Sequence, residues 1–452
     1  MGEMKKQSYS LLNQNLHKSI YELAFPGMIS SVLQTLYQLI DAYWVGKLGA
    51  SALAAIGGSS FIMWAIFSLS ALSVNGITTL VAQSVGAGEE ENGRYAAGQG
   101  MLINTVSAVL IVIVVFLTQN MLFRVMGFDE VVFNDARTYL SIVLSGLLFS
   151  FWFVGMEGVF RGIGDTKTPM IILAIALLLN AVLDPIFIFG WFGFPEMGIA
   201  GAAFATILSE IVAAGLCIQI LRRKKFLPDF RRRIDKKIIR RILSIGSPIA
   251  FGGFFFSLIY VALTGIIARF GTEAIAAIGV CHRIEGIAWF ACVGYSAAAS
   301  ALVGQNVGAR AIASAQKAAW WVNIYGVITL FLVSMVFYFW PEWLMRVFTT
   351  DVSVQKIGVE YLRIIAIFEI FLGLEVIMEG AFSGAGYTLP VMLVSVPVTL
   401  SRIPLAWFFA VNLDWGTKGI WWAIALTTLL KGMLNTVLFA MGIWKKKIGE
   451  MQ

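Results

Sequence analysis

The sequence is poor in charge. Only 13% of its 452 residues are Asp, Glu, Lys or Arg, whereas soluble proteins carry roughly a quarter. Because this deficit extends over the whole length, most of the chain must lie in lipid, which excludes a soluble domain held by one anchor. The apolar runs are long and unbroken, as in 101–117 and 325–340. Runs of this kind predict helical spans and exclude the short alternating strands of a membrane barrel.

Cysteine and histidine are also scarce. The three cysteines, Cys217, Cys281 and Cys292, lie in apolar helical runs, so we expect packing residues and no disulfide framework. The two histidines cannot build a metal triad with distant cysteines, and we predict no metal site from them. The segment GIGDTKT (162–168) lacks a preceding strand and a Gly-Lys-Ser/Thr ending, which excludes an ATP motor of the Walker type. No nucleophile elbow or HExxH motif is present, so we predict no enzyme and no cofactor.

Twelve apolar runs separated by polar breaks predict twelve transmembrane helices. Their approximate ranges are 20–46, 53–83, 95–119, 133–156, 169–191, 198–221, 243–268, 275–304, 316–341, 356–382, 390–411 and 419–443. The break at 222–241 holds eleven Lys or Arg against two Asp, and the positive-inside rule places it in the cytoplasm. The basic residues near the two termini then fall on the same side: Lys5, Lys6, Lys18, Lys445, Lys446 and Lys447. We therefore predict a multi-pass protein of the cytoplasmic (plasma) membrane with both termini cytoplasmic and no nucleic-acid partner.

The two halves of the chain repeat each other. VGKLGASALAAIG (45–57) aligns with IARFGTEAIAAIG (267–279), and MEGVFRGIGDT (156–166) aligns with MEGAFSGAGYT (378–388), at one constant offset of 222 residues. Because each copy has an even number of spans, both enter the membrane from the same face and form parallel repeats, whose interface is the expected transport site. We predict an N-lobe (1–221), a basic cytoplasmic linker (222–241) and a C-lobe (242–452).

Two intramembrane aspartates stand out in the first copy. Asp41 and Asp184 lie toward the outer ends of the first and fifth spans, where an ionisable group needs a reason to be present. Tyr37 and Asn180 each precede one of them by four residues and share its helix face, and Pro185 loosens the helix beside Asp184. Position 263 is Leu and position 406 is Ala, so neither acid recurs in the second copy. This favours a functional cluster over hydrogen bonds that serve the shared scaffold.

Other polar residues are open to two interpretations. Glu157 and Glu379 recur at the same offset before Gly-rich breaks, and we interpret them as structural, capping or pairing at a cytoplasmic gate. The second half also carries its own set of polar residues, for which structural pairing and substrate contact or gating stay open: His282, Arg283, Glu285, Glu369, Glu375, Arg402 and Lys431. We expect Arg283 or Arg402 to pair with a glutamate of the tenth span.

Together these features resemble the multidrug and toxic compound extrusion (MATE) transporters of the MOP flippase superfamily. The resemblance covers nearly the whole chain and rests on Pro26 and Asp41 in the first span, VAQSVGAG (81–88), EGVFRGIGDTKTP and NAVLDP. It implies two six-helix lobes around a central cleft, acting as a monomer. It also implies a secondary antiporter that exports cationic amphipathic organic compounds in exchange for H⁺ or Na⁺.

The resemblance also implies roles for single residues. Tyr37, Asp41, Asn180 and Asp184 are similar to the family's N-lobe cation site, where Na⁺ is one of the two candidate ions. Thr206 is the nearest candidate for a threonine of that site, and Pro26 for the bending point of the first helix. The seventh span contains no acid, unlike family members that bind the ion in the second lobe. This favours the N-lobe, although Glu369 and Glu375 keep a role for the second lobe open.

Three other classes of protein compete with this interpretation. A lipid-linked oligosaccharide flippase of the same superfamily would need a deep basic cleft for pyrophosphate, where the N-lobe offers acids. An integral-membrane enzyme would need clustered catalytic residues, and a channel is disfavoured by the two-lobe repeat. The expected mechanism is competition for one charged cavity. Protonation or Na⁺ binding neutralises Asp41 and Asp184, bends the first helix near Pro26 and releases the organic cation.

Overall fold

Long helices make up most of the protein. The computed structural model describes residue 11, residues 15–231 and residues 233–445; Lys5, Lys6, Lys446 and Lys447, on which the predicted topology partly rests, lie outside them. The helices of the first half are α2 (Leu16–Gly46), α3 (Ala50–Gly86), α4 (Glu90–Val125), α5 (Glu130–Gly162), α6 (Lys167–Phe189), η1 (Trp191–Gly193) and α7 (Ile199–Arg223). Those of the second half are α8 (Lys236–Ile267), η2 (Ala268–Phe270), α9 (Thr272–Gly308), α10 (Ile312–Phe339), α11 (Pro341–Phe348), α12 (Val352–Ala385), α13 (Leu389–Leu400), α14 (Arg402–Trp407), η3 (Phe408–Asn412) and α15 (Thr417–Ala440).

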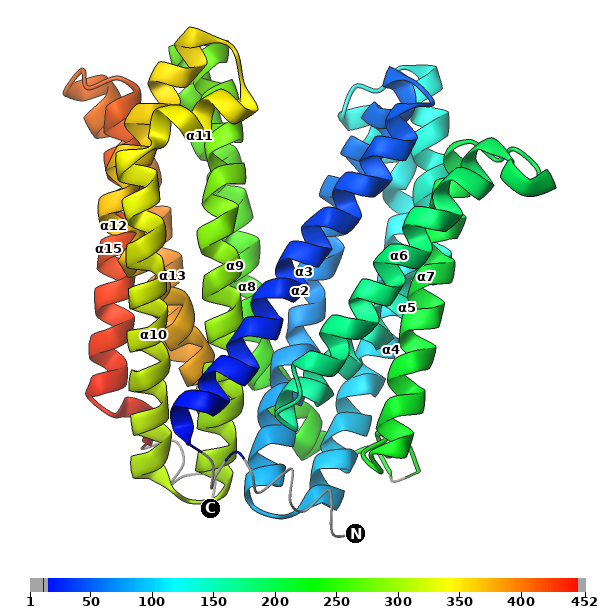
Figure 1. The fold of residues 1–452 in the computed structure, drawn as a ribbon, viewed down its shortest axis with the longest axis vertical. Coiled ribbons are helices and arrows are strands. Elements are labelled where there is room, and N and C mark those ends of the chain that lie inside the picture. Colours follow the sequence, from blue (N-terminus) through cyan, green and yellow to red (C-terminus); the bar gives the residue numbers. More distant parts are fainter. Residues whose placement is uncertain (1–10, 12–14, 232, 446–452) are drawn as a thin grey trace. The chain divides into compact units, whose positions relative to one another are not determined.

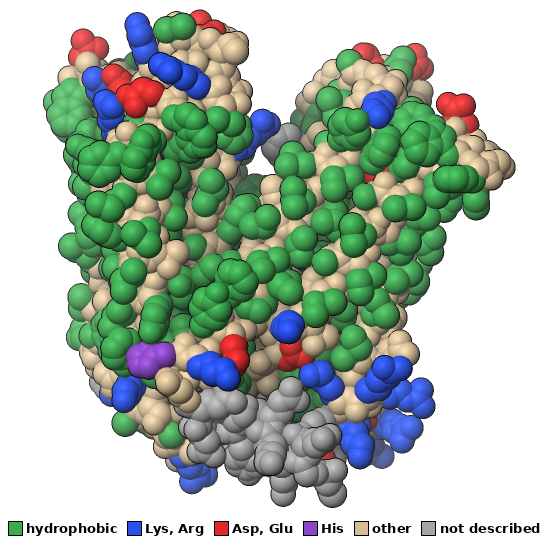
Figure 2. Space-filling model, viewed as in Figure 1, with side chains coloured by type: hydrophobic (Ala, Val, Ile, Leu, Met, Phe, Trp, Pro, Cys, Tyr) green, Lys and Arg blue, Asp and Glu red, His purple; other side chains and the backbone are tan. Residues whose placement is uncertain are grey.

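The predicted all-α membrane fold is confirmed. Within the described residues, eleven helical segments are long and apolar enough to cross a bilayer, with α13, α14 and η3 counted as one. The remaining predicted span, the tenth (356–382), is α12, which is also long enough but carries more charged residues. Figure 2 shows apolar side chains over the middle of the helices and charged ones toward their ends. Many large apolar side chains are exposed, such as Leu117 at 76% and Val261 at 72%, which suits helices that face lipid.

The chain forms two compact units. The first unit contains residues 29–246, and the second contains residues 15–28 and 247–445. The change of unit falls two residues after Pro26 within α2 and directly before Pro248 within α8. These divisions differ from the ends of the predicted linker, and the lobe boundaries at 221 and 242 stay a prediction.

The described part of the basic segment 222–241 packs on the first unit. Arg94 Nε donates to Leu227 O (3.0 Å), and Asp229 N donates to Arg94 O (2.9 Å). Tyr95 OH donates to Arg233 O (2.8 Å). A Cβ atom added at Gly98 would lie 2.1 Å from Asp229 O, so only a glycine of α4 lets the segment approach this closely. The segment is therefore bound to α4 rather than free to swing.

In the first unit, α5 packs against α3, α4 and α7, and α7 packs against α6 (Figure 1). Two glycines set the spacing of α7. A Cβ at Gly146 would lie 2.5 Å from Ile207 Cγ1, and one at Gly201 would lie 2.4 Å from Phe187 O. Such close approach is typical of membrane helices, which associate through small residues. It brings the polar side chains of α5, α6 and α7 to one place.

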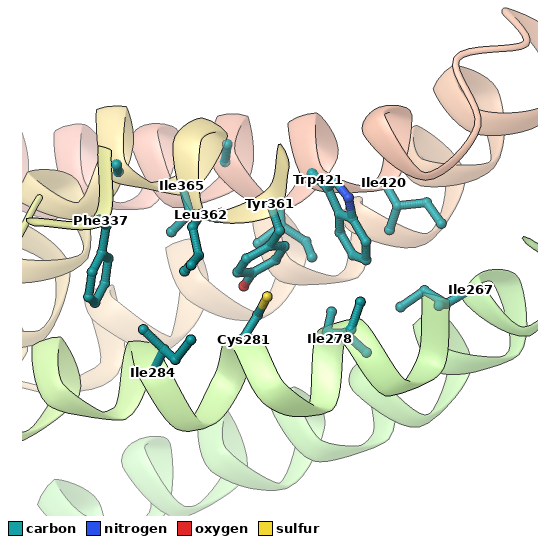
Figure 3. Close-up of a cluster of buried hydrophobic side chains, with 14 of the residues drawn as sticks. Ile267, Ile278, Cys281, Ile284, Phe337, Tyr361, Leu362, Ile365, Ile420 and Trp421 are labelled. Atoms are coloured by element: carbon teal, nitrogen blue, oxygen red, sulfur yellow. The ribbon is translucent and has the colours of Figure 1, made fainter. Parts of the chain in front are cut away.

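The second unit is built around α9, α12 and α15, which stand side by side (Figure 1). Its largest apolar cluster contains Tyr361, whose ring lies edge-on to Trp421 at 5.0 Å between ring centres. Figure 3 shows Tyr361 pointing from α12 toward Cys281 on α9. All three cysteines are buried and free, which confirms that they are packing residues.

The eleventh span is irregular, which the apolar run did not predict. Pro397 and Pro404 each remove a backbone donor, and α13 ends at Leu400 before α14 begins at Arg402. The residue between them, Ser401, keeps helical backbone angles, so the span continues in one direction. A π-helical turn, η3, follows directly.

Candidate functional site

The first unit holds three acids, two buried and one half-buried, which we call the acidic cluster: Asp41 on α2, Asp184 on α6 and Glu210 on α7, with Tyr37, Tyr139 and Asn180 around them. Asp184 is fully buried and Asp41 is 7% exposed. Each of the two tyrosines lies within electrostatic range of all three carboxylates. Asp41 and Asp184 also interact with each other. The two aspartates thus belong to the same unit and influence each other, and their role as one cation site stays a prediction.

Hydrogen bonds satisfy the acidic cluster only in part. Asn180 Nδ2 donates to Asp184 Oδ1 (3.2 Å), as the four-residue spacing on α6 predicts. Glu210 accepts from Ser150 Oγ of α5. Several buried oxygens keep no protein partner in the described structure: Asp41 Oδ1, Asp184 Oδ2, Asn180 Oδ1 and Tyr37 OH. A buried polar atom without a partner is costly, so these four atoms stand out among the polar atoms of the first unit.

The charge of the acidic cluster is not balanced by the protein. Among the described residues, no Lys or Arg forms an ion pair with Asp41, Asp184 or Glu210. The part of the chain that the structure describes also contains no group of three or more His, Cys, Asp or Glu placed to hold a metal ion.

Glu210 and Tyr139 are members of the acidic cluster that our sequence reasoning missed. Glu210 stands alone in the apolar run 198–221, and the position 222 residues later is Gly432. Glu210 is therefore, like the two aspartates, an intramembrane acid that the second copy lacks, and the sequence carries the same signal for it. Tyr139 carried no such signal, because Tyr361 occupies the equivalent position of the second copy and marks it as shared scaffold.

The other residues predicted for the first half take separate places. Thr206 donates to Ala202 O of its own helix (3.1 Å), next to the α7 turn that carries Glu210. Glu157 forms an ion pair with Arg161 within α5. Pro26 lies inside the continuous helix α2. The roles of Thr206 as an ion ligand, of Glu157 as a gate and of Pro26 as a bending point stay predictions.

The second unit carries a mixed network of buried charges. Lys431 Nζ of α15 pairs with Glu375 Oε1 of α12 at 2.5 Å. The prediction that Arg283 or Arg402 pairs with a glutamate of the tenth span is therefore wrong for Glu375. Its partner is a lysine because α12 and α15 pack directly together, while Arg402 donates its hydrogen bonds to hydroxyl groups.

The remaining residues of this network lie around that pair. Glu285 accepts from Tyr361 OH (2.8 Å). Glu369 is 1% exposed, and its Oε1 has no protein partner in the described structure. Glu379 interacts electrostatically with Glu375 and Lys431, whereas Arg283 is exposed. Substrate contact or gating by these residues stays a prediction.

Comparison with known proteins identifies the family of the chain. The MatE family model matches it twice, over residues 26–186 and 248–408. The chain belongs to the MatE family. The two matched ranges are displaced by the same 222 residues as the internal repeat, which confirms that repeat. The chain is thus a multi-pass membrane transporter of the MATE family.

Relatives and solved structures match over nearly the full length. The probable multidrug resistance protein NorM of Thermotoga maritima is 29% identical and covers 96% of this chain and 94% of its own length. The probable multidrug resistance protein YpnP of Bacillus subtilis is 27% identical and covers 97% of this chain and 98% of its own. Crystal structures of MATE in bent and in straight conformations match with TM-scores of 0.89 and 0.88, each at 24% identity and over 98% of this chain. They cover 99% and 98% of the matched chains and show the fold alone.

Proposed function

We propose that this MATE protein is a multidrug efflux antiporter, which exports cationic amphipathic organic compounds in exchange for H⁺ or Na⁺ at the acidic cluster. The observation that carries the proposal is the set of buried, unpartnered oxygens on Asp41 and Asp184, with no basic residue of the described chain paired to them. Charge buried in this way needs a counter-charge. A coupling ion and an organic cation can each supply it, so the two compete.

The chemistry of competition follows from the residues present. Low dielectric inside the unit strengthens attraction to any cation, and Tyr37 and Tyr139 add aromatic rings that attract organic cations. When a proton or Na⁺ neutralises the carboxylates, this attraction is lost and the organic cation leaves. Reciprocal linkage requires that the organic cation also lowers the affinity for the ion. Each ion that binds can thus drive one step of export.

The proposal predicts efflux that depends on an imposed ion gradient. Purified full-length protein in liposomes should expel a fluorescent lipophilic cation when a pH gradient or a Na⁺ gradient is imposed, and not when both are absent. Because the two gradients are imposed separately, the same assay identifies the coupling ion. Equal efflux with and without any gradient would refute antiport, and release by ATP would point to another energy source.

We also propose that the protein lies in the cytoplasmic membrane with both ends of the chain in the cytoplasm. The basic segment 222–241 supports this orientation through the positive-inside rule. A reporter inserted near Pro228, or fused after the C-terminus, should therefore read cytoplasmic in intact cells. An external signal from the same reporter at either point would contradict the orientation. A reporter after Gly193, which lies between α6 and α7, is the opposite-face control.

A further inference from the structure

The guanidinium of Arg402 is buried and held by neutral groups. Arg402 opens α14 in the irregular eleventh span and is 2% exposed. Its Nε donates to Thr427 Oγ1 (2.7 Å), Nη1 to Tyr260 OH (3.1 Å) and Nη2 to Thr428 Oγ1 (2.9 Å). All three acceptors are hydroxyl groups, so none of them neutralises the positive charge.

The nearby carboxylates are bound to other groups. Glu285 accepts from Tyr361, and Glu375 pairs with Lys431; both influence Tyr260 together with Arg402. Within the described residues, Arg402 itself has no ion pair. A guanidinium has five N–H donors, of which three are used here, which leaves one on each terminal nitrogen. A buried cation without a paired anion is costly, so a carboxylate bound to these two N–H groups would be stabilised.

The internal repeat shows that this position is charged in the second unit and neutral in the first. At the 222-residue offset, Arg402 stands where Asn180 stands in the first unit, and Thr428 stands where Thr206 stands. Lys431 likewise replaces Ser209. The second unit thus carries two basic side chains, Arg402 and Lys431, at positions that are neutral in the first unit. Lys431 is paired with Glu375, whereas Arg402 is held by hydroxyl groups.

Aromatic rings lead from Arg402 to the exposed face of the second unit. The ring of Tyr260 lies 4.5 Å from Phe256 and 5.3 Å from His282. Phe256 is 38% exposed, His282 is exposed and Tyr260 is half-buried. Tyr260 therefore separates the guanidinium from that face, and its hydroxyl is the ligand that an incoming anion would replace. Flat aromatic molecules pack well on such rings.

We propose that Arg402, with Tyr260, Thr427 and Thr428, binds the carboxylate of an aromatic acid whose ring rests on Phe256 and His282. The free N–H of each terminal nitrogen suits the two oxygens of one carboxylate. The site would select, among the organic cations of the proposed function, those that also carry an aromatic carboxylate. This inference depends on the proposed function only where transport is measured, because binding of the carboxylate can be measured without transport.

A pair of dyes that differ only in this group tests the site. One is a cationic xanthene dye with a free benzoate, and the other is its methyl ester, which keeps the cationic rings and removes the negative charge. In liposomes containing the full-length protein, Arg402→Gln should lower efflux of the acid by roughly tenfold or more and leave that of the ester nearly unchanged. Arg402→Lys should restore part of the loss because it keeps the charge.

The matched control is Arg269→Gln. Arg269 is an exposed arginine of the same unit that lies 4.2 Å from the centre of the Trp407 ring. Its loss should not change the ratio of acid to ester efflux. If Arg402→Gln lowers the efflux of both dyes equally, or of neither, the carboxylate site is wrong.

Binding of the dyes to wild-type protein in detergent provides a test that does not depend on any variant folding. By fluorescence anisotropy, benzoate should displace the acid dye and not the ester. Equal competition against both dyes, or none, would overturn the site. Failure of antiport instead shows as wild-type protein that moves neither dye under any gradient, so the two failures are distinguishable.

Discussion

Asp41→Asn is expected to abolish gradient-driven efflux and to leave the chain folded and inserted. The carboxamide keeps the size of the side chain but cannot ionise, so it imitates a permanently neutral site that cannot alternate between ion and organic cation. Asp41 Oδ1 has no protein partner in the described structure, so the substitution breaks no hydrogen bond there. The measurement is efflux from proteoliposomes under the coupling gradient, beside a thermal melt of the same sample.

Two further variants sharpen this test. Asp184→Asn should have the same effect, because Asp184 and Asp41 interact in one cluster. Glu157→Gln is the matched control, since Glu157 is also an acid of the first unit but is paired with Arg161 of its own helix. It should keep the dependence of efflux on the gradient and act mainly on stability or gating. If both aspartate variants transport at the wild-type rate, the acidic cluster is not the coupling site, and Glu369 and Glu375 become the candidates.

Lys431→Met is expected to lower the free energy of unfolding by about 3–5 kcal/mol, because it leaves the buried Glu375 without its counter-charge. The pair is deeply placed, with the lysine side chain 3% and the glutamate side chain 12% exposed. The measurement is reversible unfolding in detergent or bicelles. The double variant Lys431→Met with Glu375→Met should recover most of the loss, since it removes both charges together.

A second ion pair between the same two helices provides the control. Lys418 of α15 pairs with Glu360 of α12 at 3.0 Å, but these side chains are 58% and 40% exposed. Solvent screens such a pair, so Lys418→Met should cost less than about 1 kcal/mol. Similar losses of unfolding free energy from Lys418→Met and Lys431→Met would show that burial does not decide how much the Lys431–Glu375 pair stabilises the protein.

Most of the helical fold could be predicted because length and apolarity decide it. Each predicted span coincides with a helix or, for 390–411, with the series α13, α14 and η3. The bilayer imposes this regularity, since every backbone group inside it must be paired within the helix. Short helices could not be predicted because no such rule applies to them. Helix α11 lies outside the apolar runs and begins at Pro341, which suits the first turn of a helix.

Part of the acidic cluster could also be predicted. Asp184 and Asn180 share a face of α6 through local helix geometry, and their hydrogen bond confirms it. That Asp41 lies in the same cluster as Asp184 was predicted from the similar depth of the two residues in the membrane. Glu210 needed only the same attention to an isolated acid in an apolar run. Tyr139 needed the structure, because a tyrosine within an apolar helix is ordinary and gives no sign of the carboxylates it will face.

From the sequence alone, the chain is a two-fold repeat of membrane helices, and Asp41 and Asp184 are acids of the first copy that the second copy lacks. Periodicity, apolar length and a constant offset are local properties of the chain, and they survive any arrangement of the helices. Which buried charges meet depends on how the helices pack. Glu375 pairs with Lys431 because α12 packs along α15, and Arg402 lies among hydroxyl groups because α14 packs against the part of α15 that carries Thr427 and Thr428. Partners of this kind are chosen by the rotation and spacing of whole helices, which no single segment encodes.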